Sequence, residues 1–258
     1  MECLHMSGAG NDFMVIDARG MELDFEKLAL ELCKKTGADG FMAVGNSDVA
    51  DFRLHFYNSD GTRGEMCGNG ARCICKFAFD HGIAGETMAV QTDAGIVYGW
   101  RLEDDLYRVK LNNPGVLDLD RKPGVAYVEL GMPGVPHGVL EVPGLGWDKA
   151  EALWERAKAL RWDEAFPKGA NINMYAWLDE TTVRVLTFER GVEDYTLACG
   201  TGCGSTACTL WTQGKLPGGR LKCENKGGTL TVTIDGQKDM ITSVLLEGPA
   251  VVVKEYEI

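Results

Sequence analysis

The chain has 258 residues, 45% apolar and 25% charged, which is enough to bury the core of one large domain or two modest ones. Its formal net charge of −12 argues against nucleic acid and anionic membranes as partners, and no apolar stretch approaches the roughly 20 residues that cross a bilayer. Nine cysteines without a C-x2-C pair predict reduced thiols in the cytoplasm, with neither a disulfide framework nor a metal site.

The first half of the chain leads to a cysteine at the head of a glycine turn. An amphipathic helix is expected over 25–35, and the alternation in R-L-H-F-Y (53–57) predicts a strand. In M-C-G-N-G-A-R-C (66–73), Cys67 is followed by two glycines within three residues. Because glycine costs backbone entropy, this spacing predicts a tight turn whose amides approach something closely.

A helix is expected directly after this turn. The apolar spacing over 71–78 becomes helical, and Gly82 can end the helix. A strand, a turn and a second strand follow over 88–110, with the turn at the acidic residues 103–105.

The second half repeats this order. A helix is expected over 149–160, a strand over 183–188, and then A-C-G-T-G (198–202) places Cys199 before a helix that Gly214 can end. Strand, turn and strand follow over 229–246, with the turn at 235–236. Each closing glycine lies 15 residues after its cysteine, from 67 to 82 and from 199 to 214. The matched order predicts an internal duplication.

We therefore expect two related domains. The N-terminal domain would be 1–113 plus 248–258 and carry Cys67, with the last strand, 250–258, returning to it. The C-terminal domain would be 114–247 and carry Cys199. Ligand sites favour such interfaces between domains, so we expect the two cysteine turns to face each other.

Each cysteine is expected just before a helix, where amides without intrahelical partners carry partial positive charge. We expect the pKa of a thiol at this place to be lowered, from about 8.5 to as low as roughly 3.5–7.5. The neighbouring amides could hold a carboxylate, and they are those of Gly68, Asn69, Gly200 and Thr201.

Two such thiols on either side of an α-carbon suit the inversion of a stereocentre. This reaction needs a base on one face and an acid on the other, each with a single proton. Charge that flows into the carboxylate would be stabilised by the helix-end amides. The pattern indicates racemisation without a cofactor.

Other interpretations were weighed against this one. A buried, unreactive thiol is the better interpretation for five cysteines, namely Cys3, Cys33, Cys75, Cys208 and Cys223. A phosphate cradle would need a Walker lysine or a complete GxGxxG sequence, and a Cys–His hydrolase centred on His137 would not explain two cysteine turns. Two other functions are also compatible with the two cysteine turns: a protein that binds amino acids in the same pocket without turning them over, and a thiol redox sensor. Cys73 and Cys203 are either coincidental neighbours or disulfide partners for the active thiols.

The chain resembles the diaminopimelate epimerase family in six motifs spread over its whole length: S-G-A-G-N-D-F (7–13), N-S-D-G (58–61), M-C-G-N-G-A-R-C (66–73), G-A-N-I-N (169–173), F-E-R-G (188–191) and A-C-G-T-G (198–202). The resemblance implies an α+β fold of two pseudo-symmetric domains, each a mixed, mainly antiparallel β-sheet curved around a central helix. It also implies a cytoplasmic homodimer that needs no cofactor and interconverts LL- and meso-diaminopimelate in lysine and peptidoglycan biosynthesis.

Site residues follow from the same resemblance, position by position. Cys67 and Cys199 would be the acid and the base, exchanging roles with the direction of reaction. The reacting carboxylate would be bound by Gly68, Asn69, Gly200 and Thr201. The distal amino-acid group would be held by Asn11, Asn58, Asn171 and Arg190, since arginine pairs with a carboxylate through two hydrogen bonds. Glu189 and His137 would lie near the reacting amine.

Two departures from the family pattern concern substrate recognition. The family usually reads N-P-H where this chain has Val135-Pro136-His137, and the stretch from Arg190 to Cys199 is one residue longer than usual. One lost polar contact could shift substrate preference, because an unpaired buried polar group costs roughly 1–3 kcal/mol. A racemase of another polar amino acid is therefore the alternative to a diaminopimelate epimerase.

Overall fold

The computed structural model of the chain describes residues 1–64, 67–237 and 240–258, which form two compact units. Unit 1 comprises Met1–Lys110 and Glu247–Ile258, and unit 2 comprises Leu111–Leu246. None of the helices among these described residues is long and apolar enough to cross a membrane.

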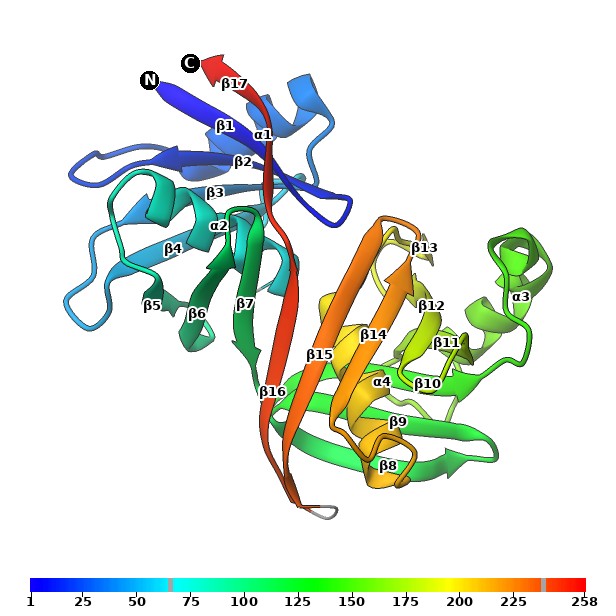
Figure 1. The fold of residues 1–258 in the computed structure, drawn as a ribbon. Helices are drawn as coiled ribbons and strands as arrows, with labels where there is room; N and C mark the ends of the chain where they lie inside the picture. Colours follow the sequence, from blue (N-terminus) through cyan, green and yellow to red (C-terminus); the bar gives the residue numbers. More distant parts are fainter. Residues whose placement is uncertain (65–66, 238–239) are drawn as a thin grey trace. The chain divides into compact units, whose positions relative to one another are not determined.

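Unit 1 is a β-sheet built around one helix (Figure 1). Its elements are β1 (Glu2–Gly8), β2 (Asn11–Asp17), α1 (Phe25–Thr36), β3 (Gly40–Gly45), β4 (Phe52–Asn58), α2 (Gly68–Asp80), β5 (Thr87–Thr92), β6 (Gly95–Glu103), β7 (Leu106–Leu111, whose last residue belongs to unit 2) and β17 (Val251–Glu257). Helix α2 packs against β1, β2, β3 and β6, whereas α1 packs against β2, β3 and β4. The central helix is α2.

Unit 2 has the same plan. Its elements are β8 (Pro114–Lys122), β9 (Val125–Gly131), β10 (Gly134–Glu141), the short 3-10 helix η1 (Trp147–Lys149), α3 (Ala150–Arg161), β11 (Asn171–Trp177), β12 (Thr182–Glu189), β13 (Asp194–Tyr195), α4 (Gly200–Thr212), β14 (Arg220–Asn225), β15 (Gly228–Gln237) and most of β16 (Met240–Pro249). Helix α4 packs against β8, β9, β10, β11, β14 and β15, and α3 packs against β11 and β12. Here α4 is the central helix.

Strand pairing reveals the duplication directly. From β1 to β6 the neighbouring strands pair antiparallel, parallel, antiparallel, parallel and antiparallel. From β9 through β12 and β14 to β15 the same five pairings recur in the same order. An antiparallel edge strand precedes each series, β17 beside β1 and β8 beside β9. The expected α+β fold, with mixed and mainly antiparallel sheets, is confirmed.

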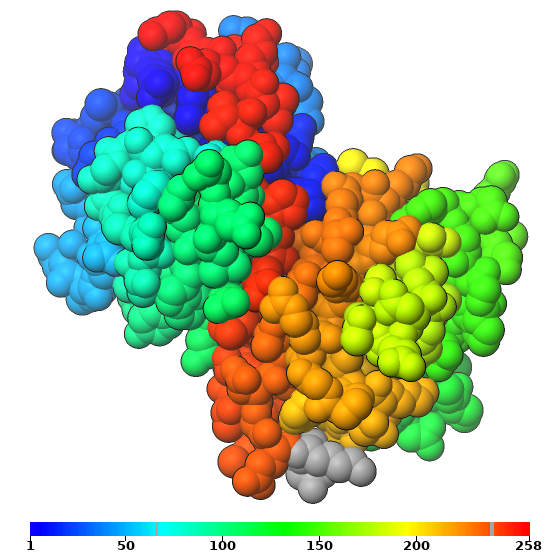
Figure 2. All heavy atoms as spheres, viewed as in Figure 1, coloured from blue at the N-terminus to red at the C-terminus, as the bar shows by residue number. Residues whose placement is uncertain are grey.

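The C-terminal strand lies in unit 1. β17 pairs antiparallel with β1, from Glu2 opposite Glu257 to Ser7 opposite Val251. Figure 2 shows the red C-terminal atoms on the surface beside the blue N-terminal ones. β17 therefore pairs with the side of β1 that β2 leaves free.

One turn position was wrong. Asp235 and Gly236, expected to form the second turn, lie within β15, which continues to Gln237. β15 is thus longer than the turn-favouring residue types indicated, and β16 begins at Met240, with 238–239 outside the described residues. Met66 of the first cysteine motif also lies outside them.

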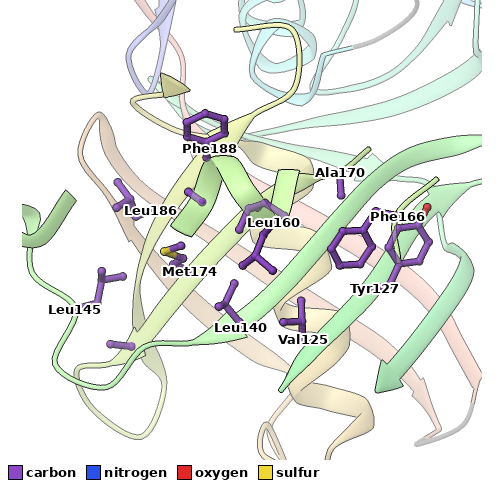
Figure 3. Packing of buried hydrophobic residues seen from close by; sticks show 13 residues of the cluster. Val125, Tyr127, Leu140, Leu145, Leu160, Phe166, Ala170, Met174, Leu186 and Phe188 are labelled. Atoms are coloured by element: carbon purple, nitrogen blue, oxygen red, sulfur yellow. The ribbon is translucent and has the colours of Figure 1, made fainter. Parts of the chain in front are cut away.

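A hydrophobic core in unit 2 lies between α3 and strands β9 to β12 (Figure 3). Met174 and Phe188 in it are fully buried, and Leu160 comes from the inner face of α3. Burial of a side chain of this size contributes about 1.5–3 kcal/mol. This packing fixes β10, β11 and β12, the strands that lead into the polar residues described next.

Candidate active site

The two cysteines occupy equivalent positions at the start of the central helices. Cys67 is the N-cap of α2 with φ −129° and ψ 124°, and Cys199 is the N-cap of α4 with φ −121° and ψ 109°. The first helical hydrogen bond in each unit goes to the cysteine carbonyl, from Ala71 N at 2.7 Å and from Cys203 N at 3.0 Å. Both helices have 13 residues. Each unit thus presents one thiol beside the N-terminal amides of a buried helix.

In unit 1 the start of α2 packs tightly against the end of β1. A Cβ on Gly8 would lie 2.8 Å from the backbone oxygen of Asn69 and 3.1 Å from Cys73 Sγ, so only glycine allows this approach. Asn69 is buried, and its side-chain amide donates to Asn11 Oδ1 at the start of β2. The family resemblance implies separate roles for these two asparagines, and the structure brings them together.

Asn58, the third asparagine among the site candidates in unit 1, lies at the exposed end of β4. Its side-chain nitrogen donates to Thr62 Oγ1 at 3.0 Å, and its backbone nitrogen donates to Thr62 O at 2.8 Å. The side chain of Asn58 therefore closes the turn after β4.

Arg72 is a buried cation that sequence analysis missed. It lies on α2, one turn after Gly68, and is fully buried. Its Nη1 donates to Gly68 O at 3.3 Å and its Nε donates to Pro249 O at 3.3 Å. The guanidinium thus ties the first turn of α2 to the segment that leads into β17. Arg72 belongs to the M-C-G-N-G-A-R-C motif, and this position close to Cys67 is the sequence feature that could have identified it as a site residue.

In unit 2, Cys199 Sγ accepts a hydrogen bond from the first turn of α4 and contacts a hydroxyl there. Gly202 N donates to it at 3.4 Å, and Thr201 Oγ1 lies 3.6 Å away. Cys199 is 7% exposed, whereas Cys67 is more open. The remaining seven cysteines are buried free thiols, as expected for the five interpreted as core residues.

Burial raises the pKa of the Cys199 thiol well above its ordinary value. The negative charge of Glu189 acts in the same direction, while the bonds from Thr201 and Gly202 lower the pKa. The expected acidification is therefore wrong for Cys199, because loss of hydration outweighs the helix end. At neutral pH this sulfur carries its proton.

His137, on β10, is fully buried and contacts Thr201, one of the carboxylate-binding candidates. Its Nε2 lies 3.0 Å from Thr201 Oγ1, and its Nδ1 lies 3.0 Å from Asn173 Nδ2. Burial, aided by the charge of Arg190, lowers the pKa of His137 to about 3, although the Asn173 bond raises it. The imidazole is neutral, and its role toward a substrate amine stays a prediction.

The other candidates in unit 2 meet at the ends of β11 and β12. Asn171 is the buried first residue of β11, and its Oδ1 accepts from Arg190 N at 2.7 Å. Arg190 follows β12 and is exposed, with Nη1 donating to Lys168 O at 3.1 Å. Glu189 accepts from Thr196 Oγ1 at 2.6 Å and lies near enough to Cys199 to affect its pKa.

The longer loop after Arg190 is braced by α3. Glu193 has a positive φ of 58°, and its carboxylate accepts from Arg161 at 2.9 and 3.2 Å and from Gly191 N at 3.0 Å. Trp154 Nε1, also on α3, donates to Asp194 at 3.1 Å. The extra residue is thus accommodated in an ordered turn, and these contacts hold the backbone that carries Arg190.

Asn173 and Thr187 were also missed. Both are buried, on β11 and β12, and Thr187 Oγ1 donates to Asn173 Oδ1 at 3.0 Å. The signal was the alternation in G-A-N-I-N: residues two apart on a strand share a face, so Asn173 accompanies Asn171.

Comparison with known proteins gives the family. A family model described as diaminopimelate epimerase matches residues 3–113 and 130–253. A diaminopimelate epimerase from Aquifex aeolicus is 34% identical over 263 residues, covering 93% of this chain and 91% of the relative. Another, from Flavobacterium psychrophilum, is 32% identical over 264 residues and covers both chains completely.

Solved structures with lower identity share the fold. A phenazine biosynthesis protein of the PhzF family from Bacillus anthracis superposes with a TM-score of 0.75 at 18% identity, covering 100% of this chain and 98% of that one. A hydroxyproline epimerase from Agrobacterium vitis gives 0.73 at 16% identity, with coverage of 100% and 90%. These structures show the fold, and the family model with the full-length relatives shows the rest: the chain belongs to the diaminopimelate epimerase family and is an isomerase.

Proposed function

We propose that this protein interconverts LL- and meso-diaminopimelate by two-cysteine proton transfer at the α-carbon, with no cofactor, for lysine and peptidoglycan biosynthesis. The observation that carries the proposal is the matched pair of N-cap cysteines, one on the buried central helix of each unit. Cys67 and Cys199 would serve as base and acid on opposite faces of the carbon. The amides at the two helix starts would stabilise the charge that reaches the carboxylate.

The protonation of Cys199 suits one half of this mechanism. Burial keeps it as a thiol, which is the form that delivers a proton to a carbanion. In the reverse direction it must lose that proton, and the donors at Gly202 and Thr201 would stabilise the thiolate. In the distal subsite, Asn171 fixes the backbone of Arg190, whose guanidinium would pair with the second carboxylate.

A racemase of another polar amino acid is the second candidate. It is favoured by Val135, an apolar side chain that is 40% exposed on β10 at the position where the family usually has asparagine. Such a site would bind the distal group of diaminopimelate with one polar contact fewer.

The test is turnover of LL-diaminopimelate by the purified protein without added cofactor, with the isomers separated by chiral chromatography. We expect meso product with the wild type, and kcat/KM about 10²–10⁴-fold lower in Cys67→Ala and in Cys199→Ala. Matched controls are Cys75→Ala on α2 and Cys208→Ala on α4, buried cysteines of the same helices that should stay active. Turnover of another amino acid would select the second candidate, and binding without turnover of any amino acid would contradict both.

A further inference from the structure

A chain of hydrogen bonds inside unit 2 ends at the thiol of Cys199. It runs from Thr187 to Asn173 at 3.0 Å, from Asn173 to His137 at 3.0 Å, and from His137 to Thr201 at 3.0 Å. The last step joins Thr201 Oγ1 to Cys199 Sγ at 3.6 Å. Thr187, Asn173 and His137 are all 2% exposed or less, so water does not compete for these bonds.

The direction of the chain is set at its far end. The Thr187 hydroxyl donates to Asn173 Oδ1, so the amide nitrogen of Asn173 faces the other way. That nitrogen contacts two acceptors, His137 Nδ1 at 3.0 Å and Gly138 O at 3.1 Å. A flipped amide would place an oxygen against the Gly138 carbonyl, so this orientation is the one that satisfies every partner.

The orientation of Asn173 determines which nitrogen of His137 is protonated. Nδ1 accepts from Asn173, and the ring is neutral, so the proton lies on Nε2 and is donated to Thr201 Oγ1. The Thr201 oxygen then acts as an acceptor toward His137 and directs its own hydroxyl proton to Cys199 Sγ.

We propose that Asn173, anchored by Thr187, is a positioning residue for Cys199: it fixes the tautomer of His137 and thereby makes Thr201 a hydrogen-bond donor to the sulfur. This inference rests on the proposed function and adds to it how one of the two thiols is prepared. With Gly202 N the sulfur then accepts two hydrogen bonds, which stabilise its thiolate. Because Sγ accepts in both, neither contact uses the S–H proton, which can be delivered to a substrate carbon.

Charged and titratable neighbours act on two members of the hydrogen-bond chain, Cys199 and His137. Glu189, on β12, and Cys203, on α4, raise the pKa of Cys199, and Arg190 lowers the pKa of His137. A neutral His137 matters for the direction of the chain, because a protonated ring would donate from both nitrogens and no longer need Asn173 as its donor. The hydroxyl of Thr201 counteracts the effect of Glu189 on the sulfur.

The test measures how readily the Cys199 thiol ionises, without any substrate and in a Cys67→Ala background. The rate of alkylation of Cys199 by iodoacetamide, quantified on its peptide by mass spectrometry, reports the thiolate fraction as pH is varied. We expect Thr201→Val and Asn173→Ala each to raise the midpoint by about one pH unit, so that alkylation below it slows about tenfold. Cys199 in the double variant should be alkylated no more slowly than in Thr201→Val alone, because both changes remove the same hydrogen bond from Thr201 to the sulfur.

A matched control is Thr209→Val, which removes a buried hydroxyl of the same helix that donates to the Ser205 carbonyl oxygen at 2.9 Å. It should leave the midpoint unchanged. Additive effects of Asn173→Ala and Thr201→Val would overturn the proposal, since a merely structural role of Asn173 acts in both backgrounds. An unchanged midpoint in Asn173→Ala would overturn it as well.

A second measurement needs no variant at position 173. In the ¹⁵N-labelled wild type, the side-chain nitrogen shifts of His137 identify which nitrogen carries the proton. We expect the Nε2–H form, and the Nδ1–H form would refute the chain direction. Neither experiment involves turnover, so failure of this proposal leaves the epimerase proposal standing. Conversely, a protein that turns over no amino acid but shows the expected midpoint shifts and the Nε2–H form would refute the proposed function and leave the positioning role of Asn173 standing.

Discussion

Gly202→Ala tests how closely α4 packs on the residues behind Cys199. Gly202 is the third residue of α4 and has no positive φ, so alanine suits its backbone and would gain about 1 kcal/mol in a helix. However, the added Cβ would lie 2.2 Å from Asn173 Oδ1 and 3.2 Å from Cys199 Cβ. Ordinary contact needs at least 3.4 Å, so the amide oxygen must move by about 1.2 Å.

The amide has little room for this movement. Asn173 is fully buried and bonded at 3.0, 3.0 and 3.1 Å to Thr187, His137 and Gly138, so a shift of this size breaks at least one bond. An unsatisfied buried polar group costs about 1–3 kcal/mol, and overpacking costs about 1–3 kcal/mol more. After the helical gain of about 1 kcal/mol, we expect the free energy of unfolding to fall by about 1–5 kcal/mol.

The assay is urea denaturation followed by circular dichroism, compared with Gly218→Ala in the same unit. An added Cβ on Gly218 meets no atom within 4 Å, and its φ is not positive. This control should be neutral or stabilising by up to about 1 kcal/mol. If Gly202→Ala were as stable as the wild type and alkylated at Cys199 at the same rate, the packing behind this thiol would not be as described.

Three further predictions concern the sulfur, the braced loop and the recognition side. Alkylation of Cys199 in Cys67→Ala should rise with pH through a midpoint above the ordinary thiol value of about 8.5, because burial raises the pKa of Cys199; a midpoint at or below that value would contradict this. Glu193→Ala should lower the free energy of unfolding by about 1–2 kcal/mol, since Arg161 is only 5% exposed and loses its anion, and urea denaturation measures this. Unchanged stability would mean that the loop is not braced by this pair. Val135→Asn should raise kcat/KM for diaminopimelate about 5- to 100-fold if a polar contact is restored there, and a decrease would point to another substrate.

Much of the fold could be predicted from local patterns. The alternation in R-L-H-F-Y gave β4, and the helical spacing after Cys67 and Cys199 gave α2 and α4, whose ends meet Gly82 and Gly214 at φ 64° and 72°. Each signal reflects a period or a backbone requirement that a sequence carries directly. Their repetition predicted the duplication that the strand pairings confirm.

The environment of the site could not be predicted in the same way. The pKa of Cys199 depends on how completely the chain buries it, and the sequence showed only its place before a helix. His137 was assigned to an amine by resemblance, whereas its contacts to Asn173 and Thr201 arise from the pairing of β10 with β11 and the packing of α4 on both. The sequence alone suggests a surface cation at Arg72. Its contact with Pro249 arises because the C-terminal segment returns to unit 1, where β17 pairs with β1. Each depends on strands brought together from distant parts of the chain.

The most direct test of the two-cysteine mechanism is the fate of the α-proton in heavy water. LL-diaminopimelate is incubated with the wild-type protein and quenched at low conversion, and deuterium at the α-carbon is measured separately in product and in remaining substrate. Two bases on opposite faces predict that the inverted product carries deuterium from its first turnovers while the remaining substrate stays unlabelled. Product that keeps the original protium would show a single base returning the proton it removed, and would contradict the account.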